Sequence, residues 1–440
     1  MEKHDYQQLG ETIYEETLPN GLLVQLLPKA GFHKTYALMT TDFGSTDRTF
    51  TPRGADEAVT IPDGVAHFLE HKMFEKADHD AFDLFGQYGA DANAYTSFTR
   101  TSYLFAASRH LKENLDILLD FVQDPYFTEA TVAKEKGIIG QEIQMYDDDP
   151  SWQLFMGIVG NLYPTEPVHI DIAGTVDSIS QITAEQLMST YQTFYHPSNM
   201  NLFIVGAFEP DSVMAWIKEN QAGKTFEQPA AIDRTIIENH DQTEILPYRS
   251  RHLDVTMPKS IVGLRGLDDV PSGRDGLKYS LAASLLLDML FADTSETYLK
   301  LYDAGIIDDS FDYDFSLERG FHFLTVSSDT DDPNGFSEAI INVLEHVSDY
   351  LSGQPAIENF ELVKREAIGH HIMMLNSVEA IANAYEGKLF DNANLLDETQ
   401  LLESLTLADV QSLAEALIRS EGISVFDVLP TEDTEDLENS

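Results

Sequence analysis

Residues 62–74 read PDGVAHFLEHKMF, and this stretch places two histidines and a carboxylate on one predicted helix. Positions four apart lie above one another on a helix, so His67 and His71 can both reach a single metal ion at roughly 2.0–2.1 Å. Glu70 lies beside them, where its carboxylate can accept a proton from an activated water molecule. The order H-x-x-E-H is the inverse of the more common H-E-x-x-H zinc helix. The stretch therefore predicts a zinc site with Glu70 as its general base.

The residues around the motif decide between this interpretation and an amphipathic helix with two exposed histidines. An apolar set would bury the helix, and its members are Val65, Ala66, Phe68, Leu69, Met73 and Phe74. Asp63 is the predicted N-cap of the helix. Because a buried histidine needs a partner, and a metal ion would supply one, this context favours the metal site.

A third ligand is needed, since a catalytic zinc ion usually has three protein ligands and one open position. The segment 128–146, TEATVAKEKGIIGQEIQMY, is predicted to be helical. Glu135 and Glu142 are two turns apart and share a face, with Ile138 and Ile139 on the apolar side. We predict that Glu142 is the third ligand and that Glu135 orients a ligating histidine or contacts substrate. The alternative is that both are solvated helix charges.

Several stretches of this chain together resemble one known family. They are DFGSTD (42–47), the H-x-x-E-H motif, ANAYTSFTRTSYLF (92–105), KEKGIIGQEI (134–143) and YQTFYHPSNMNLFIVG (191–206). Over most of its length the chain resembles the pitrilysin-like, or M16, metallopeptidases. It is most similar to small bacterial M16B-type subunits of about this length, such as the Bacillus-type zinc proteases encoded beside a second homologue.

The resemblance implies a role for each residue of the site. In such enzymes the two histidines and the downstream glutamate bind zinc, and the motif glutamate is the base. By position, one Zn²⁺ per chain would be held by His67, His71 and Glu142, with Glu70 as the base.

The resemblance also implies how substrate binds. An extended peptide would pair with the edge of the strand that contains Asn93, Ala94 and Thr96, because main-chain hydrogen bonds give affinity without strong sequence demands. The chain itself would form half of a closed chamber.

The two halves of the chain repeat one pattern of helix and strand signals, which predicts an α+β fold of two homologous lobes. Each lobe is expected to be a mostly antiparallel sheet with helices packed on it. The predicted ranges are a catalytic lobe at 1–225, a polar linker at 226–250, a metal-free lobe at 251–430 and an acidic tail at 431–440.

Aligning Phe74 with Phe291 compares the motif helix with its counterpart in the second lobe. Ser284, Leu287 and Asp288 then lie opposite His67, Glu70 and His71. The second lobe is therefore predicted to have lost the metal.

One departure from the family pattern concerns the second lobe. Active members carry there an arginine and a tyrosine that bind the substrate carbonyl, but residues 294–298 and 305–310 read TSETY and GIIDDS. Tyr298, Tyr302 and Arg319 lie nearby in the sequence without a clear assignment. We expect a heterodimer in which a metal-free homologue supplies the pair. The alternative is a weakly active or inactive homodimer that binds peptides. Retention of Glu70 favours the heterodimer, because a closed structural zinc site needs no base.

The composition limits the partners and the ligand chemistry. The chain has 440 residues, with 75 acidic and 27 basic side chains, a formal net charge of −48 and no cysteine. Such a charge repels DNA, RNA and anionic lipid, so no nucleic-acid or membrane partner is expected. Thiolate ligands and disulfides are excluded. Without a basic, apolar leader or a run of 18 apolar residues, the sequence predicts a cytoplasmic protein. The family resemblance implies that it acts on short or unfolded peptides.

Overall fold

The computed structural model describes residues 1–237, 244–385, 389–391 and 393–431. The chain forms two compact units. The first consists of Met1–Ile143, Asp171–Ile236 and His371–Asp397, and the second consists of Gln144–Ile170, Ile237–His370 and Glu398–Ser440.

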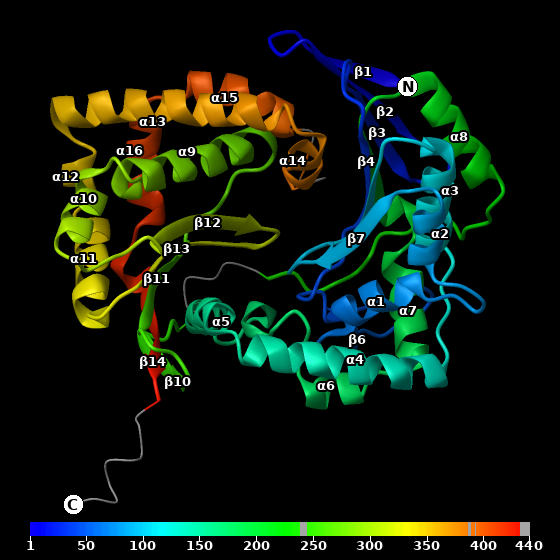
Figure 1. Cartoon of the computed structure of the whole chain (residues 1–440), viewed down its shortest axis with the longest axis horizontal. Helices are drawn as coiled ribbons and strands as arrows, with labels where there is room; N and C mark the ends of the chain where they lie inside the picture. Colours follow the sequence, from blue (N-terminus) through cyan, green and yellow to red (C-terminus); the bar gives the residue numbers. More distant parts are fainter. Residues whose placement is uncertain (238–243, 386–388, 392, 432–440) are drawn as a thin grey trace, which may run out of the picture. The chain divides into compact units, whose positions relative to one another are not determined.

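The first unit is built on a seven-stranded sheet (Figure 1). Its strands in spatial order are β1 (Glu2–Tyr6), β2 (Glu11–Thr17), β3 (Leu23–Pro28), β9 (Met200–Gly206), β4 (Thr35–Thr41), β8 (Thr101–Ala107) and β7 (Asp91–Thr96). Neighbouring strands are antiparallel except β3 and β9, which are parallel. A separate short pair joins β5 (Thr49–Phe50) and β6 (Val59–Thr60).

Both faces of the central strands of this sheet are buried. Successive residues of β4 point to opposite faces. Ala37 and Met39 join one apolar cluster with α1 (Val65–Phe74), α3 (Leu111–Val122), α7 (Ala184–Phe194) and α8 (Pro210–Ala222). Tyr36 and Leu38 join a second cluster with α14 (Val378–Asn383) and with Leu395 and Leu396 of the turn η3 (Leu395–Asp397). The remaining helical elements that begin in this unit are α2 (Ala81–Gln87), α4 (Glu129–Asp147), α6 (Val176–Ser180) and η2 (Pro197–Asn199).

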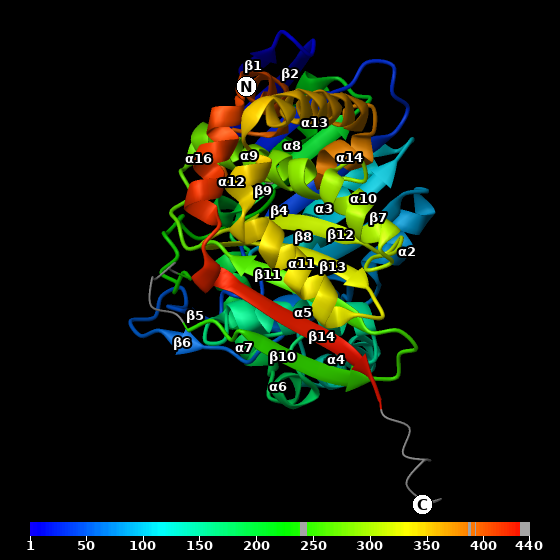
Figure 2. The same ribbon diagram turned by 90° about the vertical axis from the view of Figure 1, so that its left-hand side faces the viewer.

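The second unit contains a five-stranded sheet with the same topology. Its strands in spatial order are β10 (Tyr248–Leu253), β14 (Ile423–Pro430), β11 (Lys259–Arg265), β13 (Phe321–Asp329) and β12 (Asp312–Glu318). Figure 2 shows β14 between β10 and β11. The pair β10–β14 is parallel and the others are antiparallel, so the order matches β3-β9-β4-β8-β7 strand for strand. This confirms the predicted α+β fold of two sheet-and-helix halves.

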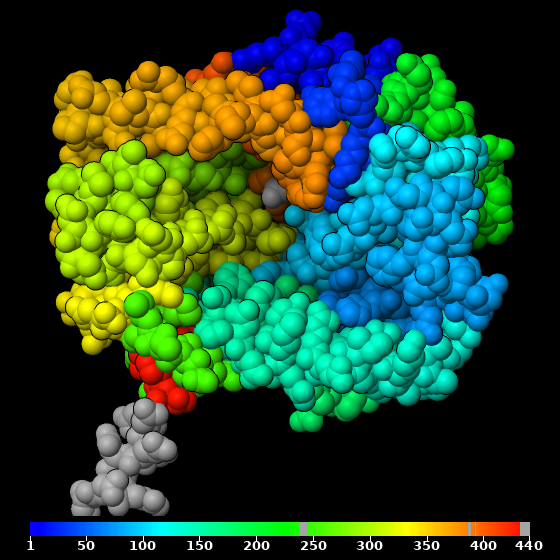
Figure 3. Space-filling model, in the orientation of Figure 1, coloured from blue at the N-terminus to red at the C-terminus, as the bar shows by residue number. Residues whose placement is uncertain are grey.

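The helices of the second unit also cover two faces of their sheet. One face packs on α9 (Gly273–Phe291), α11 (Pro333–Glu345) and α16 (Leu407–Leu417). The other face packs on α5 (Pro150–Leu162), where Ile158 reaches Gly263 of β11. The remaining helical elements that begin in this unit are α10 (Glu296–Asp303), α12 (Val347–Tyr350), α13 (Gly353–Met374), α15 (Glu398–Ser404), η1 (Pro167–His169) and η4 (Ser420–Gly422). The space-filling view shows α10 and α13 at the surface, where Leu299 and Leu362 are exposed (Figure 3).

The two units differ from the predicted sequence ranges because the repeats exchange segments. Residues 144–170, which include α5, belong to the second unit although they precede residue 225. Residues 371–397, which include α14, belong to the first unit although they follow residue 251. Helix α14, from the second repeat, covers one face of the first unit's sheet, and α5, from the first repeat, covers one face of the second unit's sheet. Each of these helices follows a long helix, α13 or α4.

The first part of the predicted linker is a strap packed on the first unit. The Thr51 N–H donates to the Asp233 carbonyl oxygen at 2.8 Å. Arg234 forms ion pairs with Asp42 and, at 3.2 Å, with the buried Asp47. Residues 226–236 therefore do not separate the units as a free polar connection. The predicted linker also overlaps the start of β10, and the tail at 432–440 lies outside the described residues.

The motif helix begins differently from the prediction. Gly64, rather than Asp63, is its N-cap, with φ of 89° and no side-chain cap. A Cβ at Gly64 would lie 2.4 Å from the Ala173 carbonyl oxygen, so a residue with a side chain does not fit there. Asp63 instead forms an ion pair with Arg48 at 2.5 Å.

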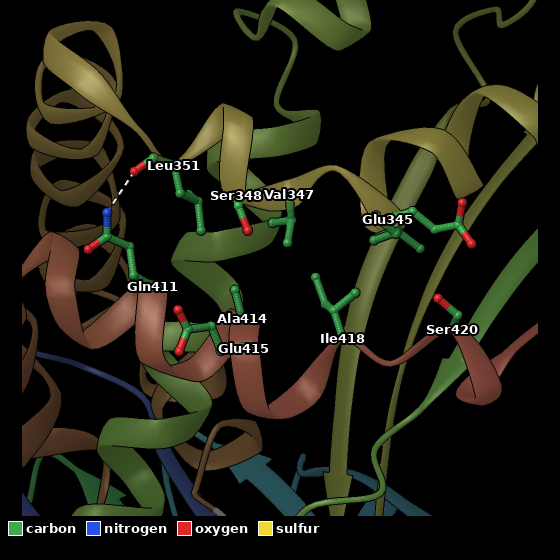
Figure 4. A pocket seen from close by; sticks show the side chains of 10 residues that line it. Glu345, Val347, Ser348, Leu351, Gln411, Ala414, Glu415, Ile418 and Ser420 are labelled. Carbon is green, nitrogen blue, oxygen red and sulfur yellow. Dashed lines mark hydrogen bonds between the residues drawn. The ribbon is translucent and has the colours of Figure 1, made fainter.

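A groove of about 390 Å³ lies on the second unit (Figure 4). Its lining residues come from α11, α12, α16 and their neighbours, and they are Leu344, Glu345, Val347, Ser348, Leu351, Gln411, Ala414, Glu415, Ile418 and Ser420. None of the predicted site residues lines it. In the part of the chain that the structure describes, no helix is long and apolar enough to cross a membrane.

Candidate metal centre

Helix α1 buries one side completely and presents the two motif histidines at its edge. Phe68 and Leu69 are fully buried in the apolar cluster of the first unit. His67 is buried and His71 is half-buried, and their ring centroids are 4.6 Å apart. The predicted helical spacing therefore brings both rings to one place.

Helix α4 supplies the carboxylates. Of its residues, Val132, Glu135, Ile139 and Ile143 are buried, and Glu142 is half-buried. Ile138, expected on the apolar side, is 46% exposed, because the buried stripe of this helix passes through Ile139 instead. Glu135 is only 7% exposed, so the alternative of a solvated charge is wrong for this residue.

The three predicted ligands come together in the first unit. The Glu142 Oε1 atom lies 3.6 Å from His67 Nε2, and its Oε2 atom lies 3.4 Å from His71 Nε2. Among the described residues, these three side chains form a group whose ligand atoms all lie within 4.8 Å of one another.

The same distances test whether a zinc ion fits. The two distances between Glu142 oxygens and histidine Nε2 atoms exceed the usual hydrogen-bond range of about 2.7–3.2 Å. Bonds of 2.0–2.1 Å in a tetrahedral site place neighbouring ligand atoms about 3.3 Å apart, close to the separations observed here. Two imidazole nitrogens and one carboxylate oxygen are also a donor set that zinc accepts in catalytic sites. The residues therefore fit a zinc ion.

Hydrogen bonding orients the second histidine. The Nδ1 atom of His71 lies 3.1 Å from Glu135 Oε1, which leaves its Nε2 atom facing Glu142. A carboxylate behind a ligating histidine usually fixes the ring and its tautomer. Glu135 thus occupies the position predicted for an orienting carboxylate.

The protonation of the histidines differs because their surroundings differ. Burial, with a smaller contribution from the His71 charge, lowers the pKa of His67 to about 3, so His67 is neutral near pH 7. Burial also lowers the pKa of His71, but the hydrogen bond to Glu135 and the nearby carboxylates outweigh it and raise that pKa above 6.5.

Glu70 lies beside this group and has its own partner. The Thr96 hydroxyl donates to Glu70 Oε2 at 2.6 Å. Burial raises the pKa of Glu70 above its ordinary value, although the hydrogen bond from Thr96 opposes the shift. A carboxylate with a raised pKa is a stronger base once it is ionised.

The sequence interpretation assigned Thr96 to the substrate strand and missed its contact with Glu70. The signal was available in the alternation of β7, where Ala92 and Ala94 pack against the cluster that contains α1. Thr96 follows them on the same face of the strand.

Strand β7 is the edge of its sheet and pairs only with β8 within the described residues. The Ser97 N–H donates to the Arg100 carbonyl oxygen at 2.8 Å, next to the pair Thr96–Thr101. Since bonded and non-bonded pairs alternate in an antiparallel ladder, the backbone groups of Ala94 and Thr96 point to the free edge. The Ala94 N–H instead bonds to the Asn93 side-chain oxygen at 2.9 Å.

The corresponding positions of the second unit carry no such group. Leu287 is buried in the core, and Asp288 accepts a hydrogen bond from the Tyr313 hydroxyl at 2.9 Å. Within 294–298, the Ser295 hydroxyl oxygen accepts a bond from the Tyr298 N–H and so caps α10. In 305–310, Ile307 is buried.

Comparison with known proteins agrees with this architecture. Residues 56–176 match the family model described as Insulinase (Peptidase family M16), and residues 181–362 match the model described as Peptidase M16 inactive domain. The chain is 46% identical to the uncharacterized zinc protease YmfH of Bacillus subtilis over 97% of this chain and 98% of that protein.

Two solved structures show the extent of the shared fold. A putative M16-like peptidase from Alicyclobacillus acidocaldarius matches with a TM-score of 0.89 and 35% identity, over 96% of this chain and 99% of that one. The periplasmic protease PqqL from Escherichia coli matches with a TM-score of 0.69 and 18% identity, over 98% of this chain and 48% of that one. From the two family models and the identity to YmfH along nearly its whole length, this chain belongs to peptidase family M16.

Proposed function

We propose that this chain is the zinc-binding subunit of an endopeptidase that hydrolyses short or unfolded peptides. The observation that carries the proposal is the arrangement of His67, His71 and Glu142 around one point, with Glu70 beside them and not among the three. A site with three protein ligands and a separate base is typical of a catalytic rather than a structural zinc centre. The name of YmfH as a zinc protease supports the same chemistry.

The proposed mechanism assigns one task to each residue. A zinc ion held by the two Nε2 atoms and Glu142 would act as a Lewis acid toward water and the substrate carbonyl. Glu135 holds the His71 ring in its ligating orientation through Nδ1. Glu70 accepts the proton of the attacking water and then delivers it to the leaving amine.

The free edge of β7 is the proposed binding place for the substrate backbone. An extended peptide would add as a further strand and bond to the outward groups of Ala94 and Thr96. The Asn93 side-chain oxygen accepts a hydrogen bond from the Ala94 N–H, so this side chain would have to turn away before a peptide could bind there. It could then form a hydrogen bond with the peptide itself. Main-chain recognition of this kind accepts many sequences but requires an unfolded segment.

The proposal includes a second, homologous subunit. Residues 294–298 contain no arginine and residues 305–310 contain no tyrosine, although the family carries these carbonyl-binding residues in the two stretches. Here Ser295 of the first stretch caps α10, and Ile307 of the second is buried in the core. In PqqL the matched fold takes 48% of the chain, so this chain corresponds in length to half of that molecule. We propose that a metal-free homologue supplies the missing groups.

A second candidate function is a weakly active or inactive homodimer that binds peptides. The segments 294–298 and 305–310 favour it, because the isolated chain has no arginine and tyrosine at the places where the family binds the substrate carbonyl. The two candidates differ in whether mixing with the metal-free homologue raises turnover.

The test compares wild type with Glu70→Gln, each with and without the metal-free homologue. We expect the variant to keep zinc and to lose turnover of an unstructured peptide by at least about 10²-fold. We also expect mixing with the homologue to raise wild-type turnover. Equal rates for wild type and variant would contradict the assignment of the base, and full activity of the isolated chain would contradict the need for a partner.

A further inference from the structure

The hydrogen bond between Thr96 and Glu70 joins the proposed base to the proposed substrate strand. Glu70 belongs to the H-x-x-E-H motif, but it is not one of the three residues, His67, His71 and Glu142, that can hold a metal. Among the residues that the structure describes, its hydrogen-bond partner is Thr96, at 2.6 Å. A glutamate side chain has several rotatable bonds, so its carboxylate needs such a partner to stay in one place.

Thr96 has two sets of polar groups that point in different directions. Its hydroxyl points to α1 and bonds to Glu70, because it lies on the same strand face as Ala92 and Ala94. Its backbone N–H and carbonyl point to the free edge of the sheet, as the alternation from Ser97 and Arg100 requires. Thr96 therefore contacts the proposed base through its hydroxyl and faces the proposed peptide-binding edge of β7 through its backbone.

The second unit supplies an internal comparison. Leu287 is the counterpart of Glu70, and it is buried in the apolar cluster of the second unit. From β12, Tyr313 and Phe315 pack on the same cluster, with their rings against Phe291 and Tyr279 of α9. The repeat that lacks the carboxylate thus also lacks a threonine on the strand beside it. This paired difference is expected if the hydroxyl serves the carboxylate.

We propose that Thr96 is a positioning residue, which holds Glu70 in its working orientation and links that orientation to the strand that receives the substrate. The proposal rests on the proposed function, in which Glu70 is the base. It does not require Thr96 to touch the reacting atoms.

The kinetic test uses Thr96→Val and Thr96→Ser in the zinc-loaded chain with its homologue. Valine has the same shape without the hydroxyl, so kcat should fall roughly 10- to 100-fold, the scale for losing one hydrogen bond to a charged group. KM should stay nearly unchanged, because the backbone groups at the edge remain. Serine should restore most of kcat. Thr40→Val is the matched control, since it removes a half-buried threonine hydroxyl bonded to Ser102 at 2.8 Å in the same sheet, and it should behave as wild type.

A crystal structure of Thr96→Val gives a second measurement that does not depend on turnover. We expect the Glu70 carboxylate to leave its position while His67, His71 and Glu142 keep theirs. Thr96→Val with wild-type kcat and an unmoved Glu70 would overturn the proposal, and so would a loss of kcat that serine does not restore. If the wild type hydrolyses no peptide, the proposed function fails, and the position of Glu70 in the variant still decides the role of Thr96.

Discussion

Replacement of Glu142 by glutamine tests the proposed ligand set most directly. The change keeps the size of the side chain and removes the negative charge from the atoms that lie 3.6 and 3.4 Å from the two Nε2 atoms. Sites with four protein ligands bind zinc with roughly 10–16 kcal/mol, or about 2.5–4 kcal/mol for each ligand. At 1.4 kcal/mol for each factor of ten, Glu142→Gln should weaken zinc binding about 10²- to 10³-fold.

Two further glutamates of α4 serve as graded controls. Glu135 contacts His71 through a hydrogen bond and is not placed as a ligand, so Glu135→Gln should weaken binding by only about 10- to 100-fold. Glu129 lies in the first turn of the helix and accepts a hydrogen bond from the Ala184 N–H at 3.3 Å, away from the histidines. Glu129→Gln should bind zinc as wild type does.

The assay is competition of each purified variant with a chelator of known zinc affinity at pH 8, after circular dichroism has shown that each one is folded. The ordering of the three losses matters more than their size. Equal affinity of wild type and Glu142→Gln would refute the ligand assignment. A larger loss in Glu135→Gln than in Glu142→Gln would move the third ligand to Glu135.

Three other predictions concern pH and packing. Because the pKa of His71 lies above 6.5, protons should already compete with zinc near neutral pH, and zinc affinity should fall as the pH drops from about 8 to 6; a flat affinity profile would contradict this. Gly157→Ala should destabilise the chain by about 1–3 kcal/mol in urea unfolding, because a Cβ there would lie 2.3 Å from the Phe426 ring, whereas Gly160→Ala meets nothing closer than 4.0 Å and should stabilise α5 slightly. Arg234→Met should cost about 3 kcal/mol, since it removes the guanidinium that is paired with the buried Asp47 carboxylate; unchanged unfolding would show that this ion pair of the strap contributes no stability.

The elements that the sequence predicts well are those whose signal is local. The four-residue spacing of His67 and His71 and the two-turn spacing of Glu135 and Glu142 each lie within one short segment, and the structure contains both segments as helices. The turn at residues 147–150 also ends α4 and starts α5, because Asp149 caps the helix that begins at Pro150.

The features that the sequence interpretation misplaced depend on distant contacts. Gly64 starts α1 because the Ala173 carbonyl group, more than one hundred residues away, leaves no room for a Cβ. The strap at 226–236 is polar in sequence, and only its bonds to residues such as Asp47 make it part of the first unit. The exchange of α5 and α14 between the units has no local signal. The apolar side of each helix predicts that it is buried, but it does not show which sheet buries it.

The comparison of the two repeats bears on why the first one keeps its polar group. The second repeat builds the same order of five strands with Leu287 at the position of Glu70 and no threonine on β12, so the fold needs neither the carboxylate nor the hydroxyl. Burying a carboxylate such as Glu70 costs free energy, which its raised pKa reflects, and an apolar residue at the same place avoids that cost. Packing therefore gives no reason for Glu70 to be present. The reason has to come from what the carboxylate does, and its position beside three potential metal ligands and behind an open strand edge indicates proton transfer on a bound peptide.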